Sequence, residues 1–470
     1  MFLKRQFVKN SKEILSQARD RYFHQPFRLL TDWGELLILP PAFADEIRND
    51  SRLSFAEAAT KDNHAGIPGF ETIRLIGQID RPVQVVARNN NYLMKEKDTI
   101  IEPMSKETSL AVTLNLGISN DWTEVQIKPA ILDIIARISS RIQLGEELCR
   151  NEDWLRITKT YTTTFYAATT NLRAFPSALR FLVHWFHPDC QKLRFELDKA
   201  RQIIGPLVQR RRDLRRAAVA EGQPPPRFND AIDWADEQAA KAGSAFDPVV
   251  FQLTLSLLSI HTTYDLLQQT MIELARNSQY VEPIRREVLQ VLRTEGLKKT
   301  SLAKMKLLDS CIKEAQRLKP GSIVTMRRLV LEEMTLSNGL VLEKGTRLNI
   351  DNSRMNDPKF YRDPGTYNPY RFVDMREEAG KEHMAHLVST SSTHLGFGHG
   401  EHACPGRFFA SNEIKMALCH ILVKYEWKLS RGTDVEPDTR GMVSKSSPET
   451  CMLVRLRDHP ELDLDVLGEA

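Results

Sequence analysis

The sequence lacks long apolar runs, paired cysteines and an excess of charge of either sign. Its longest apolar stretch, residues 251–260, is interrupted by glutamine, threonine and serine and falls short of the roughly 18 residues that span a bilayer. The 6 cysteines are scattered without a C-x-x-C pair, which excludes the usual zinc-ligand spacing. Lys and Arg total 65 against 61 Asp and Glu, a net charge of +4 that argues against a nucleic-acid-coating protein.

A secretory signal is also missing, because the basic first ten residues contain no apolar core. Hydrophobic residues make up 41% and charged residues 27% of the chain, which is ordinary globular composition. A chain of this length buries about 75% of its unfolded surface, so it needs no disulfide framework. We therefore expect free cysteines and a reducing compartment.

Apolar residues at helical spacing predict helices at 122–144, 181–212, 245–268, 302–318 and 413–425. Pro188 and Pro206 are expected to break the second of these helices. Three consecutive prolines predict an exposed loop at 221–230, within one domain rather than between two.

A basic cluster closes the second predicted helix, at Arg210, Arg211, Arg212, Arg215 and Arg216. Cations are tolerated near a helix C-terminus. A solvated face is the interpretation that we favour for this cluster, and a docking patch is the alternative.

Strands are expected only at 326–336 and 340–350, joined by the hairpin turn at Ser337, Asn338 and Gly339. The predicted fold class is therefore mainly α with a small β portion, built as a single domain over 1–470.

The strongest local signal is the glycine-rich stretch 395–408 around Cys404. Glycines permit a tight turn in which backbone N–H groups approach the sulfur, and a helix begins just after it. Both features favour a thiolate of lowered pKa. From the residues alone, a zinc site and a catalytic cysteine paired with His399 or His402 remain open.

This stretch resembles the cysteine-ligand loop of the cytochrome P-450 family, Phe-x-x-Gly-x-Arg-x-Cys-x-Gly. Phe397, Gly400, Cys404 and Gly406 match, whereas His402 stands where the family has its propionate-binding arginine. The histidine-bearing loop is similar to those of fungal secondary-metabolism members in the ent-kaurene oxidase-like group. The resemblance implies that Cys404 is the axial iron ligand, with Phe397, Gly398 and His402 in the haem-binding loop.

Two further motifs carry the resemblance, in family order. Glu314 and Arg317 form a Glu-x-x-Arg pair on one helix face, and the family joins such a pair to an arginine that matches Arg371. The stretch 258–263 is similar to the family's oxygen-activating helix. By this resemblance Thr262 helps to deliver protons to iron-bound oxygen.

That helix departs from the family pattern in two places. Ser259 replaces a smaller residue, and His261 replaces the family's acid. His261 could relay protons, since imidazole titrates near neutrality. The alternative is a structural histidine bonded to a carbonyl or water.

The resemblance also implies positions for the haem propionates and for the substrate pocket. Arg328 aligns with a propionate-binding arginine, and Arg327 is its competitor. The pocket-lining residues that it implies are Ile323, Val324, Ser444, Ser446 and Ser447.

Taken over residues 27–457, the resemblance implies a single-domain cytochrome P-450 fold holding haem b. The expected activity is a monooxygenase reaction on a hydrophobic secondary metabolite, with a terpenoid as first choice. Radical coupling or rearrangement of an alkaloid or polyketide, without net oxygen insertion, is the alternative, followed by a non-enzymatic haem sensor or carrier.

The resemblance finally implies partners and a location. No G-x-G-x-x-G dinucleotide motif occurs, so electrons are expected from a separate NADPH-dependent flavoprotein reductase. We expect a monomer that binds no nucleic acid. The family's membrane anchor and proline-rich hinge are not found before Phe27, so both the cytosolic face of the endoplasmic reticulum and a soluble cytoplasmic location are open.

Overall fold

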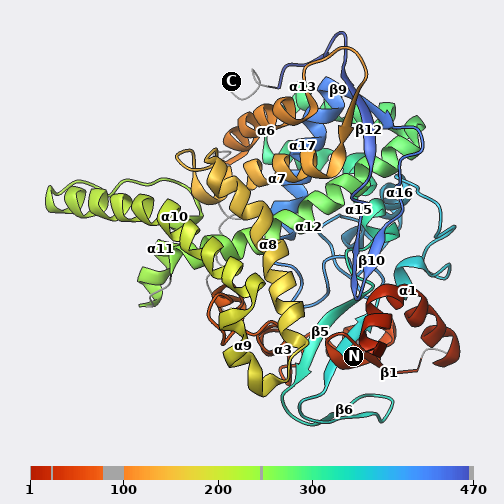
Figure 1. Cartoon of the computed structure of the whole chain (residues 1–470). Helices are drawn as coiled ribbons and strands as arrows, with labels where there is room; N and C mark the ends of the chain where they lie inside the picture. The colour runs from red at the N-terminus through yellow and green to blue at the C-terminus, as the bar shows by residue number, and fades with distance from the viewer. Residues whose placement is uncertain (1, 23–24, 78–99, 244–246, 465–470) are drawn as a thin grey trace. The chain divides into compact units, whose positions relative to one another are not determined.

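The computed structural model describes residues 2–22, 25–77, 100–243 and 247–464 (Figure 1). Its helices are α1 (Phe2–Tyr22), α2 (Ala44–Ile47), α3 (Phe55–Asp62), α4 (Glu71–Gly77), α6 (Ile101–Leu116), α7 (Ile127–Leu144), α8 (Glu152–Arg173), α9 (Arg180–Phe186), α10 (Pro188–Ala220), α11 (Ala231–Ala242), α12 (Pro248–Arg276), α13 (Val281–Glu295), α14 (Lys299–Lys304), α15 (Lys306–Leu318), α16 (Arg371–Glu377) and α17 (Arg407–Lys424). The strands are β1 (Phe27–Thr31), β2 (Gly34–Leu39), β3 (Leu53–Ser54), β4 (Thr123–Gln126), β5 (Val324–Val330), β6 (Met334–Thr335), β7 (Val341–Leu342), β8 (Arg347–Asp351), β9 (Tyr425–Leu429), β10 (Asp438–Arg440), β11 (Val443–Lys445) and β12 (Cys451–Leu456). The predicted class, mainly α with a small β portion, is confirmed.

The chain forms two compact units, and one domain over 1–470 stays a prediction. The first unit comprises 1–58, 116–131 and 262–470, and the second comprises 59–115 and 132–261. The four boundaries fall inside α3, α6, α7 and α12, so each of these helices contributes residues to both units. Continuous helices explain why the sequence shows no linker at these boundaries.

All strands of the described chain lie in the first unit. The largest sheet has the order β1-β2-β8-β5-β3, in which β2 and β8 run parallel and the other pairs are antiparallel. A second sheet has the order β4-β12-β9. The predicted hairpin is confirmed: β6 pairs with β7, and Gly339 takes the left-handed φ of 82° that its turn requires.

Helix boundaries follow local capping signals that the apolar pattern does not show. Asn151 accepts a hydrogen bond from the Trp154 backbone N–H at 2.9 Å and starts α8. Asp230 caps α11 in the same way, and that helix ends at Gly243 in a left-handed conformation.

Two predicted boundaries are wrong for physical reasons. Residues 123–126 are not helical but pair as β4 with β12, because inter-strand hydrogen bonds replace helical ones. Helix α10 breaks before Pro188 but continues through Pro206. Ile204 and Leu207 on either side are buried, and this packing offsets the hydrogen bond that proline cannot make.

The helix pattern near the cysteine loop also differs in detail from the expectation. Helix α12 is displaced towards the C-terminus relative to the predicted 245–268. The predicted helix 302–318 is divided, because Met305 adopts the non-helical ψ of 78° between α14 and α15. The last predicted helix begins earlier, at Arg407.

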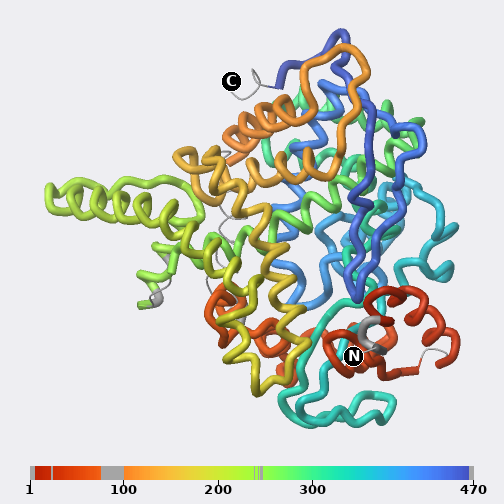
Figure 2. The backbone as a smooth tube through the Cα atoms, viewed as in Figure 1, coloured from red at the N-terminus to blue at the C-terminus, as the bar shows by residue number. Residues whose placement is uncertain are grey.

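The basic cluster of α10 is largely a solvated face, because Arg210, Arg212 and Arg216 are exposed, whereas Arg211 and Arg215 form ion pairs with α11 and its N-cap. Arg211 is 2% exposed and donates to Asp230 at 2.6 Å. Arg215 pairs with Asp233 and Asp236, which also lie on α11. These ion pairs fasten α11 to α10, and Figures 1 and 2 show the chain returning through the proline-rich loop between the two helices.

No helix of the described residues is long and apolar enough to cross a membrane. The cysteines form no disulfide, as expected.

Candidate haem site

The glycine-rich stretch forms a tight loop immediately before α17. The Cys404 backbone N–H donates to the Phe397 carbonyl at 2.8 Å, and Gly398 donates to Leu395 at 2.9 Å. Gly398 and Gly400 hold positive φ angles of 71° and 81°. These conformations and hydrogen bonds fold the loop back on itself so that Cys404 and Phe397 lie side by side.

Two glycines in the loop are required by close contacts. A Cβ added to Gly396 would overlap the Gln316 side chain, including its Cγ at 2.8 Å. A Cβ on Gly400 would lie 2.5 Å from Asn49 Oδ1 and 2.9 Å from the Arg48 carbonyl. The loop therefore packs closely against Gln316 of α15 on one side and against Arg48 and Asn49, which follow α2, on the other.

Cys404 is the exposed cysteine of the described chain; the other cysteines are buried or half-buried. Burial nevertheless raises the pKa of its thiol, because the sulfur lies deep among protein atoms while remaining accessible. The N–H groups of Gly406 and Arg407 and the Arg407 charge act in the opposite direction. The expected net lowering of the pKa is thus wrong for the chain alone, since desolvation exceeds the effect of these donors.

The two histidines of the loop lie in different surroundings. His399 is buried, and its Nε2 lies 2.9 Å from Asp45 Oδ1 and 3.1 Å from Arg48 Nη1. These contacts tie the loop to α2 and make His399 structural. His402, which stands in place of the family's arginine, is exposed in the same loop, and Phe397 is half-buried.

No cluster of histidine, cysteine and carboxylate side chains suited to a metal ion occurs among the described residues. The zinc alternative has no support there. A sole thiolate with an accessible sulfur is instead the donor expected for an iron porphyrin.

Arg328 is a buried cation that the described protein leaves partly without partners. It is 2% exposed, and only its Nη1 has a hydrogen bond, to the Arg327 carbonyl at 2.9 Å. Its Nε and Nη2 have no hydrogen-bond partner among the described residues. Burial lowers its pKa to about 10, and a buried guanidinium of this kind calls for an anionic ligand.

The backbone explains why Arg328 and Arg327 differ. The β5–β8 register shifts between Thr325 and Arg328, and Met326 has a positive φ of 51°. Such a bulge redirects the side chains that follow it. Arg327 consequently lies over the Trp33 ring at 4.4 Å, while Arg328 points to the interior.

Helix α12 exposes a short stripe in its otherwise buried middle. Leu258 is 39% exposed, and Thr262, one turn later on the same face, is also exposed. His261 is buried and its Nε2 lies 3.1 Å from the Lys159 carbonyl. The structure therefore places Thr262 on the accessible face and His261 away from it.

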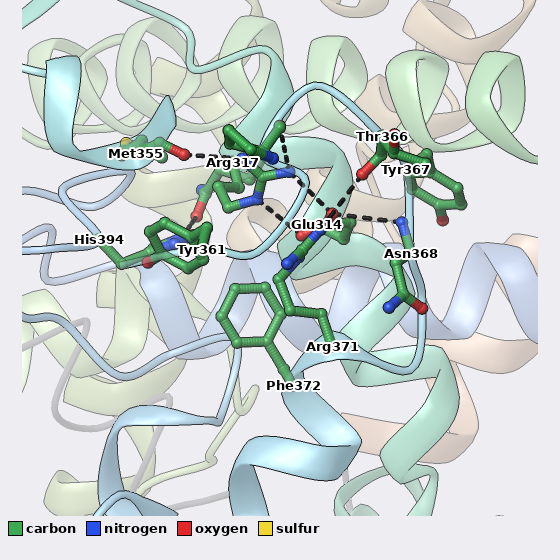
Figure 3. Close-up of polar contacts among 12 residues, drawn as sticks. Glu314, Arg317, Met355, Tyr361, Thr366, Tyr367, Asn368, Arg371, Phe372 and His394 are labelled. Atoms are coloured by element: carbon green, nitrogen blue, oxygen red, sulfur yellow. Dashed lines mark hydrogen bonds and ion pairs between the residues drawn. The ribbon is translucent and has the colours of Figure 1, made fainter. Parts of the chain in front are cut away.

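The three-residue structural cluster implied by the resemblance is confirmed (Figure 3). Glu314 accepts from Arg317 at 2.8 Å and from Arg371 at 2.9 Å. Arg317 also donates to the carbonyls of Met355 and Pro364, at 2.7 and 2.8 Å. Breaking a buried ion-pair cluster by removing one partner costs roughly 3–5 kcal/mol.

The predicted pocket-lining residues are distributed differently from the expectation. Val324 is 2% exposed and packs in a cluster with Phe7 and Leu15, and the half-buried Ile323 packs against the same cluster. Ser444, Ser446 and Ser447 are buried. Their hydroxyls bond to other protein groups, so they do not present them to a ligand.

Sequence reasoning missed two charged residues near this region. Asp265 on α12 and Lys319 after α15 form a buried ion pair. Their separation in the sequence hides the contact. One signal in the sequence could have indicated this pair. Asp265 lies in an apolar helix one turn after Thr262, and no Lys or Arg stands three or four residues from it to neutralise its charge.

The site residues fit a haem. Cys404 is an exposed cysteine just before α17, and Arg328 offers two buried donors suited to a propionate. Thr262 is an exposed residue of α12.

Comparisons with known proteins agree with this chemistry. The cytochrome P450 family model matches residues 95–453. A cytochrome P450 monooxygenase of Gibberella fujikuroi is 59% identical over 466 residues, covering 99% of this chain and 88% of that protein. The monooxygenase hepE of Aspergillus oryzae is 42% identical over 97% of this chain and 83% of its own length.

The fold is similar to that of a solved structure. Retinoic-acid-bound cyanobacterial CYP120A1 matches with a TM-score of 0.69 and 17% identity, over 97% of this chain and 96% of that one. The family match and the relatives together account for the cysteine loop, the Glu-x-x-Arg cluster and the fold. The chain belongs to the cytochrome P450 family, and it is a haem-dependent monooxygenase.

Proposed function

We propose that this monooxygenase oxidises a hydrophobic secondary metabolite in a fungal-type biosynthetic pathway, with a terpenoid as the first candidate. The observation that carries the proposal is the accessible Cys404 thiol in its glycine-lined loop. An apolar substrate is supported by Leu258, which lies exposed beside Thr262 on the same helix face.

Bound haem b would supply dioxygen activation, and thiolate ligation favours O–O cleavage. Cys404 would hold the iron, with Phe397 and Gly398 shaping the loop around the sulfur. Arg328 would bind one propionate through its Nε and Nη2, and His402 would donate to another. The chain's own task is to hold this group, orient substrate and exclude water.

Thr262 would hold and pass a proton at its Oγ1, because its side chain lies on the accessible stripe of α12. His261 has a structural bond to the Lys159 carbonyl, which favours the structural alternative for this residue. A proton-relay role for His261 would require its ring to leave that carbonyl.

The spectroscopic test replaces the proposed ligand. In Cys404→Ser the red-shifted Soret band of the reduced carbonyl complex should disappear, because a hydroxyl donates less electron density than a thiolate. The matched control is Cys451→Ser, which alters a half-buried cysteine outside the loop. An unchanged band in Cys404→Ser would refute the ligand assignment.

The role of Thr262 is tested separately. Thr262→Ala should raise peroxide release relative to product, because the proton route loses its hydroxyl. Equal coupling in the two proteins would count against proton delivery by Thr262.

Radical coupling or rearrangement without net oxygen insertion is the second candidate. It is favoured by the placement of His261, since the family's acid is absent and its replacement is bonded away from Thr262. Turnover under isotopically labelled dioxygen distinguishes the two, because simple hydroxylation carries the label into product.

We propose an NADPH-dependent flavoprotein reductase as electron donor, a monomeric state, and the cytosolic face of the endoplasmic reticulum as location. Product formation that depends on added reductase and NADPH tests the donor. Sedimentation of the purified protein tests the oligomeric state, and cell fractionation tests the location.

A further inference from the structure

A surface cavity of about 330 Å³ lies within the second unit. One wall is formed by residues from the end of α3 and the segment that follows it, within 60–67. The other wall is formed by residues just before and at the start of α9, within 177–181. None of the residues assigned above to haem binding or proton delivery lines this cavity, so it has no part in the function proposed above.

Two cationic side chains line the cavity, Lys61 on the first wall and Arg180 on the second. Neither has an acidic partner within the part of the chain that the structure describes. Arg180 donates from Nε to the Phe175 carbonyl at 2.9 Å and from Nη2 to the Arg173 carbonyl at 3.4 Å. These bonds fix the guanidinium and use two of its five N–H donors, so further donors remain for a ligand.

The charges around the cavity favour an anion. His64 also lines the cavity, and its pKa is lowered to about 4, first by burial and then by the charges of Arg180 and Arg173. The opposing charge of Asp62 has a smaller effect on this pKa. The local potential is therefore positive, which raises the local concentration of anions.

The rim of the cavity is apolar on the side of α9. Phe181 lines the cavity and is 68% exposed. Other large hydrophobic side chains near it in the sequence are also exposed, namely Phe175, Leu179, Leu182, Trp185 and Phe186. Exposed apolar side chains concentrated in this way indicate an interaction surface.

We propose that the cavity binds an anionic amphiphile, whose carboxylate or phosphate head group contacts Lys61 and Arg180 and whose hydrocarbon chain lies over Phe181. Two cations on opposite walls can share one anionic group, and charge-assisted hydrogen bonds are stronger than neutral ones. Ser177 adds a hydroxyl donor on the second wall. A free amphiphilic metabolite and a membrane lipid both offer this chemistry, and the experiment separates them.

The first test is calorimetry of the haem-loaded protein with dodecyl phosphate, below its critical micelle concentration. Saturating imidazole occupies the iron, so that binding is measured away from it. In the double variant Lys61→Gln with Arg180→Gln, we expect the Kd to rise about tenfold or more, because hydrogen bonds to charged groups are lost.

The matched control for the loss of charge is Arg216→Gln with Lys241→Gln. It removes two exposed cations of the same unit that do not line the cavity. The control should leave the dodecyl phosphate Kd unchanged.

A second variant fills the cavity without removing a charge. Gly66 lines the cavity, a Cβ added to it has no atom within 4 Å, and its φ is not positive. Gly66→Leu should therefore fold normally, while its side chain occupies space that the ligand needs. We expect the Kd to rise about tenfold or more, with a smaller change in Gly66→Ala.

Two further probes separate the head group from the chain. Dodecyltrimethylammonium has the same chain with a cationic head group, and it should bind about tenfold or more weakly than dodecyl phosphate. Inorganic phosphate has no chain and should also bind about tenfold or more weakly, because it buries no apolar surface. Phe181→Ser should weaken dodecyl phosphate binding and leave the phosphate Kd unchanged.

Vesicles distinguish the two sources of the ligand. Wild-type protein that sediments with phosphatidic acid vesicles but not with phosphatidylcholine vesicles, while the double variant stays in solution, would assign the head group to a membrane lipid. Binding of dodecyl phosphate without vesicle binding would assign a free amphiphile. Equal dodecyl phosphate Kd values in the wild type, the double variant and Gly66→Leu would overturn the inference, as would equally tight binding of dodecyltrimethylammonium.

Discussion

At the scale of single residues, Arg328 is the clearest indication of a bound anion, because its Nε and Nη2 have no partner among the residues that the structure describes. Replacing it in Arg328→Leu removes a buried charge that the described residues satisfy only through Nη1. The free energy of unfolding of the apoprotein should therefore not fall, whereas haem should dissociate faster. A hydrogen bond to a charged group contributes about 1.5–3 kcal/mol, so we expect a tenfold or greater rate, measured by haem transfer to excess apomyoglobin.

Arg327→Leu is the control for this experiment. Its guanidinium lies over Trp33, so the variant should lose stability and retain haem as well as the wild type does. If Arg327→Leu released haem rapidly and Arg328→Leu released it slowly, Arg327 and not Arg328 would be the residue that binds the propionate.

A second residue makes stability depend on pH. Burial lowers the pKa of His64 to about 4, although its Nε2 lies 3.2 Å from the Thr169 carbonyl. The unfolded chain takes up a proton below about pH 6.5 and the folded chain does not until about pH 4. The unfolded state binds more protons in this window, so stability is complete above it and decreases as the pH falls.

The variant His64→Asn tests this dependence. Asparagine tolerates the left-handed φ of 57° at this position. The loss of unfolding free energy between pH 7 and pH 5 should be smaller in the variant by about 1 kcal/mol, measured by urea denaturation. Identical losses in both proteins would show that His64 does not titrate in this way.

The resemblance to the family points to Cys404, Arg328 and the Glu314 cluster, because each lies in or beside a short motif. Neither the resemblance nor the residue types predict the buried contact of Asp265 with Lys319 and Ser446. Asp265 and Ser446 are 181 residues apart, and only the folded chain brings them together. The resemblance places Ser444, Ser446 and Ser447 at the pocket, because the sequence does not show what their hydroxyls contact.

At the scale of elements, the cysteine loop depends on glycine packing against α15. Gly396→Ala should destabilise the loop and reduce haem incorporation, since the new methyl group would overlap the Gln316 side chain. A conflict of this kind typically costs about 1–3 kcal/mol, measurable as a lower thermal midpoint and a lower ratio of Soret to protein absorbance. Gly365→Ala is the matched control, because that glycine has open space around it and no positive φ.

Equal haem content in Gly396→Ala and Gly365→Ala would contradict this packing argument. The sequence predicted that glycines shape the loop but not which neighbour each one meets. It likewise predicted most helices, yet it missed the passage of α10 through Pro206 and the pairing of residues 123–126 as β4. Those outcomes depend on tertiary contacts that outweigh local preference.

At the scale of the whole molecule, haem should couple to folding. A ligand that binds only the folded chain stabilises it by about 2.7 kcal/mol at a free concentration of 100 times Kd. The thermal midpoint of the protein should thus rise on haem loading, and the rise should be smaller in Arg328→Leu. A midpoint that is insensitive to haem, measured by circular dichroism, would contradict the assignment of these residues to the haem site.

The two-unit division was not visible in the sequence, for a physical reason. Domain boundaries are normally recognised by polar, flexible linkers, but here the boundaries fall within the helices α3, α6, α7 and α12. Family and fold class could be predicted because they depend on short motifs and composition, which the division does not alter.

The ion pairs between α10 and α11 have a practical consequence. They fasten both helices that flank the proline-rich loop 221–229, so the loop itself does not hold them together. Exposed loop tips of this kind tolerate insertion and cleavage. An affinity tag or a protease site placed there should leave a protein that migrates as one species under native conditions, and as two fragments only after denaturation.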